Sequence, residues 1–199
     1  PPDRSGLASF TCEMSIRGAG ERDNRRLIED LDNLGVDRSE SVSDSHLRYG
    51  GATVAANLPE TLAIYADILR QPHLPEDQLE AGRLAMLQEL RAVEDEPAQK
   101  VMIELQRHFY PEPWGRPSQG EQAALECTTI DDIRQFVSRH FRPKGTILGV
   151  AGKIDWPCVE DTVERLLGDW AGSPEPPLSE RSTTRKKTHL PYESNQTQI

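Results

Sequence analysis

The stretch at residues 6–35, GLASFTCEMSIRGAGERDNRRLIEDLDNLG, decides the fold because it predicts two consecutive helices joined by a short loop. In its first half, apolar side chains that include Phe10 and Met14 recur at helical spacing. Its second half begins at Asp23 and Asn24, either of which could serve as a helix N-cap, and ends at Gly35, a residue type that favours the position after a helix. The stretch therefore predicts a helix–loop–helix unit whose apolar faces must pack against the rest of the chain.

Beyond this unit, the sequence predicts many helices and few strands. Residues 39–54 lose the helical period and predict one or two strands interrupted by a glycine pair, and the apolar run at residues 146–152 predicts another short strand. Further helices are predicted from Asn57, from Leu74 to about Val93, after Pro97, from Thr129 to about Phe141, and from Asp155 to Trp170. Because strands and helices do not alternate regularly, the pattern indicates an α+β fold, with a layer of helices packed on a mostly antiparallel sheet.

The balance of helices and strands also bears on the domain organisation. Two or three strands cannot cover the apolar surface of so many helices, so we expect some sheet strands to lie outside these 199 residues. Residues 1–172 are predicted to form one domain that lacks its first strands. Residues 173–199 are rich in Pro and Ser and are predicted to be a linker, followed by the start of a further strand or of a second domain.

Composition excludes several classes of partner. The formal net charge of −10 at pH 7 would repel a phosphate backbone, so nucleic acid is not an expected partner. The sequence contains no apolar run of 18 residues, so no membrane span is expected, and we expect a soluble protein of the cytoplasm or the periplasm. Three cysteines without a Cys-x-x-Cys pair argue against both a disulfide framework and a zinc ribbon.

Several short stretches, taken in order, resemble a known family. They are residues 2–8, residues 27–35, Leu58-Pro59-Glu60, Leu87-Gln88-Glu89-Leu90 followed by Asp95-Glu96-Pro97, residues 114–117 with Gly120, and residues 147–154. Together they resemble the amino-terminal domain of the insulinase/pitrilysin-like metallopeptidases, the inverzincins. The resemblance implies a mitochondrial-processing-peptidase-like metallohydrolase domain and, in active relatives, a zinc cofactor.

The family's zinc motif is His-x-x-Glu-His on the first helix, completed by a Glu on a later helix. Imidazoles at i and i+4 share one helix face and hold the metal, while the Glu between them activates a bound water. By the resemblance, the three motif positions here carry Ser9, Cys12 and Glu13, so both imidazoles and the base are lost. Glu89 stands at the later position and keeps its carboxylate, whereas the position of an accessory Glu carries Gly82.

The remaining polar side chains predict no metal site. Ser9 and Glu13 would share a helix face, but a hydroxyl and carboxylates without an imidazole form a poor zinc ligand set. Trp114, in a Pro-rich loop, is expected to anchor that loop against the helices, or alternatively to serve as a ligand platform. The five histidines show no i, i+4 pairing: His46, His73, His108, His140 and His189. We therefore expect no catalytic residue and no metal in this chain.

The resemblance also implies a mode of assembly. The family builds its proteases from two such domains per chain, often paired with a second chain, and in many pairs one partner lacks the zinc motif. We therefore expect a proteolytically inactive domain that forms a homo- or hetero-oligomer with a catalytic zinc-peptidase domain or subunit and encloses a peptide. Two alternatives stay open: an active zinc metalloendopeptidase with ligands from another domain or chain, and a binding or scaffold module with no peptidase link.

Overall fold

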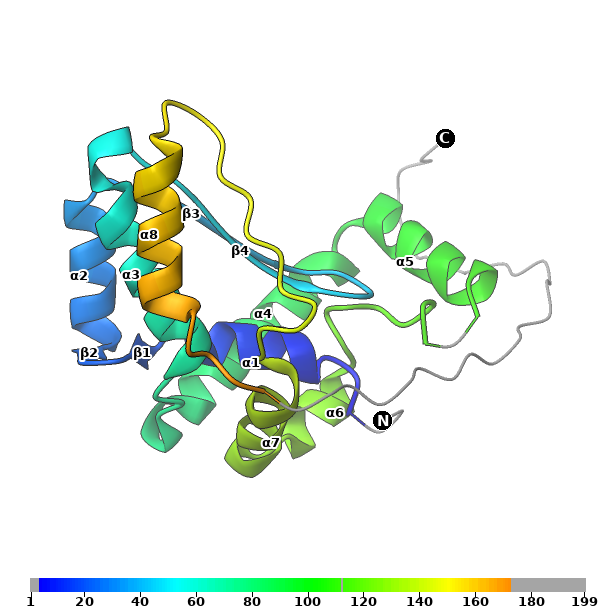
Figure 1. Cartoon of the computed structure of the whole chain (residues 1–199). Helices are drawn as coiled ribbons and strands as arrows, with labels where there is room; N and C mark the ends of the chain where they lie inside the picture. Colours follow the sequence, from blue (N-terminus) through cyan, green and yellow to red (C-terminus); the bar gives the residue numbers. More distant parts are fainter. Residues whose placement is uncertain (1–3, 112, 173–199) are drawn as a thin grey trace.

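The computed structural model describes residues 4–111 and 113–172 (Figure 1). The predicted linker at 173–199 lies outside the described residues. The helices are α1 Leu7–Ser15, α2 Asn24–Asn33, α3 Leu58–Arg70, α4 Leu79–Glu94, α5 Pro97–Phe109, α6 Gln122–Cys127, α7 Ile130–His140 and α8 Trp156–Leu167. The strands are β1 Gly18–Ala19, β2 Arg22–Asp23, β3 Asp37–Val42 and β4 Leu47–Ala52.

The predicted helix–loop–helix unit is confirmed as α1 and α2. Its loop is more regular than expected, because β1 and β2 pair there as a tight antiparallel hairpin. Of the two candidate caps, Asp23 is the one that caps α2: its side chain accepts a hydrogen bond of 2.8 Å from the backbone N–H of Arg26. Gly35 follows the helix at φ 62°, in the left-handed region where glycine carries no Cβ penalty.

The strands predicted at residues 39–54 are confirmed as the antiparallel hairpin β3–β4. The glycine pair does not interrupt the hairpin but lies inside β4, where Gly50 faces Ser39 and Gly51 faces Arg38. A Cβ atom at Gly50 would lie 2.7 Å from the Ser39 side-chain oxygen, so the close approach of the two strands explains glycine there. The hairpin and the helices together confirm the α+β fold.

Two apolar clusters form the core. The first lies where α1 meets α4, α6 and α7, and the second lies where α2 and α3 meet the β1–β2 hairpin. Figure 1 shows α2, α3 and α8 together at one end of the molecule and α5 at the opposite end. The buried side chains of the first cluster are Phe10, Met14, Leu74, Met86, Leu125, Ile130 and Ile133. Those of the second are Ala19, Leu27, Leu31, Val36, Ile64 and Ile68.

Two sequence predictions need correction. The strand expected at residues 146–152 is wrong within the described part of the chain, because the segment is not paired in a sheet there, and Ile147 is 92% exposed. The long helix begins at Leu79 and not at Leu74, because Leu74 adopts φ 50° and a short 3-10 turn precedes the helix. The six-residue helix α6 was not predicted, since it is too short to show a helical period.

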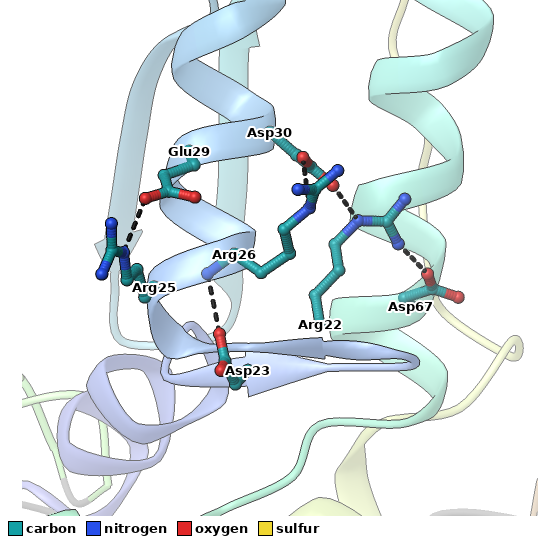
Figure 2. A network of polar contacts seen from close by, with 7 residues as sticks. All are labelled: Arg22, Asp23, Arg25, Arg26, Glu29, Asp30 and Asp67. Carbon is teal, nitrogen blue, oxygen red and sulfur yellow. Dashed lines mark hydrogen bonds and ion pairs between the residues drawn. The ribbon is translucent and has the colours of Figure 1, made fainter.

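Arg22 joins α2 to α3 through two ion pairs (Figure 2). Its Nε atom lies 2.9 Å from Asp30 Oδ2 on α2, and its Nη1 atom lies 2.8 Å from Asp67 Oδ2 on α3. Arg26 also contacts Asp30, with 2.8 Å between Nε and Oδ1. The Arg22 side chain is only 26% exposed, so these pairs are partly shielded from solvent.

We expect Arg22→Ala to lower the free energy of unfolding by about 1–2 kcal/mol, because it leaves Asp30 and Asp67 without their shared partner. The matched control is Arg25→Ala. Arg25 also pairs with a carboxylate, Glu29, but its side chain is 87% exposed, so its loss should cost less than about 0.5 kcal/mol. Urea unfolding of both variants measures the difference, and equal losses would contradict the bridging role.

Candidate functional site

Three of the four predicted site positions lie on α1, at the centre of the first apolar cluster. The helix is largely enclosed: Phe10, Thr11, Cys12, Met14 and Ser15 are all buried. It packs against α4, which carries the fourth position. The candidate site is therefore the junction of α1 and α4.

Ser9 is held by a loop that crosses the start of α1. Its hydroxyl donates a hydrogen bond of 2.6 Å to the backbone carbonyl of Ser118. The same loop approaches the backbone of Gly6 so closely that a Cβ atom on Gly120 would lie 2.7 Å from the Gly6 nitrogen. The Ser9 hydroxyl thus links the loop to the helix.

Glu13 is paired with a residue of its own helix end. Its Oε1 atom lies 2.6 Å from Arg17 Nη2 at i, i+4 spacing, and both side chains are largely shielded from solvent. Arg17 also reaches Gln78 with Nη1 at 3.4 Å, while its buried Nε has no hydrogen-bond partner among the described residues. A cation beside the Glu13 carboxylate disfavours a second cation at the same place.

Cys12 belongs to a buried polar cluster between α1 and β4. Ser15 Oγ donates a hydrogen bond of 2.7 Å to the Cys12 carbonyl and lies 2.7 Å from Tyr49 Oη. Burial raises the pKa of the Cys12 thiol to about 11, a hydrogen bond with Tyr49 lowers it, and the nearby carboxylates of Glu40 and Glu13 raise it. Burial also raises the pKa of Tyr49 well above its ordinary value. The thiol is therefore neutral at physiological pH, and its burial disfavours the thiolate form.

The raised pKa of Cys12 predicts a loss of stability in alkali. The pKa of Cys12 in the folded state lies above its unfolded value of 9.0. The protonated thiol therefore makes its full contribution to the free energy of unfolding below pH 9, and this contribution is lost as the pH rises towards 11. Across this pH range, we expect ionisation of the Cys12 thiol to lower the free energy of unfolding by about 2 kcal/mol. Urea unfolding at several pH values should show a smaller decline for Cys12→Ala than for the parent chain. The exposed Cys127, replaced by alanine, is the control, and parallel curves for all three proteins would contradict the prediction.

Glu89 is exposed on α4 and makes no hydrogen bond or ion pair with another described residue. It lies on the same stripe of α4 as Gly82, seven positions before it, and Met86, three positions before it, and both of those residues are buried against α1. A Cβ atom on Gly82 would lie 2.8 Å from Met14 Sδ, so the position of the accessory Glu is closed by packing. Glu89 thus keeps a free carboxylate on the α4 stripe that packs on α1.

These side chains do not fit a zinc ion. Ser9 is bonded to a backbone carbonyl, Glu13 is paired with an arginine, and Cys12 is a buried neutral thiol. Within residues 4–111 and 113–172, no group of three His, Cys, Asp or Glu side chains could hold a metal ion. The arrangement supports packing and hydrogen bonding.

The histidines lie apart from this junction. His46 contacts Ser43 Oγ at 2.8 Å, and His73 Nε2 contacts the Gly20 carbonyl oxygen at 2.6 Å. His108 lies 3.7 Å from Glu104, and His140 stacks on a neighbouring ring of its own helix. His189 lies outside the described residues. Trp114 is half-buried in its loop.

The residues that contact the side chains at the three positions on α1 were not identified from the sequence. The Glu13–Arg17 pair could have been found from its i, i+4 spacing. Tyr49 and Ser118 could not, because only the folded hairpin and the crossing loop bring them to α1. Within residues 4–111 and 113–172, none of the helices has the length and hydrophobicity that a membrane-spanning helix needs.

The chain is similar in sequence and in fold to known proteases. The chain is 25% identical over 167 residues to an uncharacterized zinc protease of Rickettsia bellii, a match that covers 83% of this chain and 40% of that protein. It is 23% identical to a probable mitochondrial-processing peptidase subunit beta of Arabidopsis thaliana, over 86% of this chain and 33% of that one. A crystal structure of a protease from Helicobacter pylori superposes with a TM-score of 0.81 at 20% identity, covering 90% of this chain and 45% of the other.

The chain thus spans less than half the length of these relatives. Family models account for nearly all of it. Residues 1–120 match the model described as insulinase (peptidase family M16), and residues 128–199 match the model described as the peptidase M16 inactive domain. Because the first model alone matches more than half of its residues, the chain belongs to the insulinase family of peptidases.

Proposed function

We propose that this chain is a proteolytically inactive insulinase-like domain that pairs with a catalytic zinc-peptidase counterpart and encloses a peptide with it. One observation carries the proposal: each side chain at the three motif positions on α1 is engaged in a contact that leaves it unsuited to zinc. The match of residues 128–199 to the inactive-domain model supports the same conclusion.

A domain without metal can still contribute to peptide cleavage. Half of a closed chamber excludes water and fixes the position of an unfolded peptide, even when the other half supplies the metal. The acidic balance of this chain, −10 at pH 7, would favour peptides and partner surfaces of positive charge. The chemistry would then take place entirely on the partner.

Zinc analysis and reconstitution test the proposal together. We expect the purified chain to hold substoichiometric zinc, to cleave no peptide alone, and to copurify from its native source with a homologue that has an intact His-x-x-Glu-His motif. The mixture should cleave unfolded peptides faster than the homologue alone. A Glu89→Ala variant is the control, because stoichiometric zinc that is lost with Glu89 would establish the active alternative instead.

A different negative result would favour the scaffold alternative. If no homologue with the zinc motif copurifies, and if mixtures with such homologues cleave peptides no faster than the homologue alone, the pairing is wrong. The domain would then keep the family fold without a part in proteolysis.

A further inference from the structure

A cleft of about 280 Å³ lies between α4, α5 and the loop that leads into α6. Its apolar floor comes from Leu87, Leu90 and Val93 on α4 and from Ile103 on α5. Three of these four side chains are only half-buried, so the cleft leaves apolar surface in contact with water. The four candidate site positions on α1 and α4 do not line it. The cleft is therefore distinct from the candidate site.

The walls of the cleft are held in place by contacts within the chain. Arg107 of α5 lies with Nη1 3.2 Å from Oε1 of Glu104 and with Nη2 3.2 Å from Oε1 of Glu121, which belongs to the loop. The preceding residue of the loop, Gly120, lies against the backbone of Gly6. The loop is thus fixed both to α5 and to the start of α1. Sites for small molecules are usually formed in advance in this way.

The lining of the cleft carries positive charge that the chain does not balance. Its charged side chains are three cations and two carboxylates, a net charge of +1, in a chain whose net charge is −10. Both carboxylates, Glu104 and Glu121, pair with one cation, Arg107. Arg91 is exposed and makes no ion pair with another described residue. A guanidinium in this state can accept an anionic partner.

The other two cations belong to the end of the cleft beside the α4–α5 turn. Arg91 is in the last turn of α4, and Lys100 is the fourth residue of α5. Arg107 follows on α5 at a distance of about 10 Å along the helix axis. The exposed acidic residues at 95–96, in the turn itself, do not line the cleft. This end of the cleft therefore favours an anion, while its floor favours an apolar group.

We propose that this cleft binds a free monocarboxylic acid with a small apolar body. The carboxylate accepts two hydrogen bonds from Arg91, and its single negative charge balances the net charge of the lining. The apolar body covers Leu90 and Ile103 and displaces water from them. The volume is that of about nine water molecules, so it suits a ligand of about ten non-hydrogen atoms. The proposal does not depend on the proposed function.

Other occupants fit the cleft less well. A neutral apolar ligand leaves the Arg91 guanidinium without a partner. A dicarboxylate or a phosphate monoester brings more negative charge than the lining balances. A peptide segment is larger than the cleft, which has room for only one side chain and one carboxylate.

Isothermal titration of the intact protein with octanoate tests the proposal. We expect a dissociation constant below about 1 mM at low salt. Octanol lacks the charge and acetate lacks the apolar body, so each should bind at least about 10-fold more weakly than octanoate. Octanol that binds as tightly as octanoate would overturn the proposal, and so would octanoate that does not bind. An acetylated peptide with a carboxyl-terminal leucine carries both groups, and binding of this peptide without binding of octanoate would overturn it as well.

Substitutions of Arg91 test where the anion binds. Arg91→Ala should weaken octanoate binding at least about 10-fold, and Arg91→Glu should reverse the preference, so that octylamine binds better than octanoate. The matched control is Arg139→Ala. Arg139 is also an exposed arginine in the last turn of a helix and makes no ion pair with another described residue, but it lies outside the cleft.

The control variant should bind octanoate as tightly as the parent chain. Because both arginines are exposed, neither alanine variant should lose its fold, which circular dichroism verifies. Equal losses of affinity in Arg91→Ala and Arg139→Ala, or no loss in either, would overturn the proposal.

Discussion

The Ser9→His/Cys12→Glu/Glu13→His variant should bind zinc at least about 100-fold more tightly than the parent chain. It places imidazoles at i and i+4 on α1 and leaves Glu89 on the facing stripe of α4, so that three ligands and a water can surround the metal. Even partners outside the ligand shell change metal affinity 10- to 100-fold, so the gain of two direct ligands should exceed that range. Isothermal titration with zinc at neutral pH measures it.

Two further variants make the result specific. Glu89→Ala in the same background should return the affinity towards that of the parent chain, because it removes the third ligand. A variant with only Ser9→His and Glu13→His should bind zinc about as well as the full set, since the residue at Cys12 corresponds to the base and not to a ligand. Circular dichroism melts without zinc would verify that all variants fold. If folded variants bind no better than the parent, then Glu89 does not face α1 and the assignment of motif positions is wrong.

Gly120→Ala should lower the free energy of unfolding by about 3 kcal/mol or more. Gly120 has φ 86°, where an added Cβ atom costs roughly 1–2 kcal/mol, and that atom would also lie 2.7 Å from the Gly6 nitrogen and from the Ser5 carbonyl oxygen. Backbone atoms at the start of α1 cannot move aside as a flexible side chain would. Displacing the loop would also break the hydrogen bond from Ser9 to Ser118. Urea unfolding measures the loss.

Gly145 provides a matched control for that variant. It has φ 90°, almost the same backbone conformation, but no atom lies within 4 Å of an added Cβ. Gly145→Ala should therefore lower the free energy of unfolding only by the roughly 1–2 kcal/mol that a side chain costs at positive φ. The difference between the two losses is the cost of the close approach to Gly6, and equal losses would show that the loop yields easily.

The features that could be predicted from the sequence are those formed by residues that lie close together along the chain. The caps of α2 and α7 depend on residues three positions apart, and the hydrogen bonds of Asp23 and Thr129 formed as those spacings indicate. A helix forms its backbone hydrogen bonds within its own segment, so the apolar spacing of that segment is enough to predict the helix. The run at residues 146–150 shows the opposite case, because a strand exists only where another strand pairs with it.

In the candidate site too, some features could be predicted from the sequence and others could not. The positions of Ser9, Cys12, Glu13 and Glu89 follow from the order of short motifs along the chain. Their contacts depend on the tertiary fold, which joins Ser9 to a loop 109 residues away and places Tyr49 beside the thiol. Candidate motif positions can therefore be predicted from the sequence, but the contacts of the side chains at those positions cannot.

The hydrogen bond between Ser9 and Ser118 also bears on whether the lost site could return one mutation at a time. A histidine at residue 9 alone would remove that bond and yet gain no metal, because a second imidazole would still be absent. A histidine at residue 13 alone would remove the ion pair with Arg17, again without a ligand set. Each first step lowers stability before any metal can compensate for it. The present contacts therefore oppose each single step towards a zinc-binding set of side chains on α1.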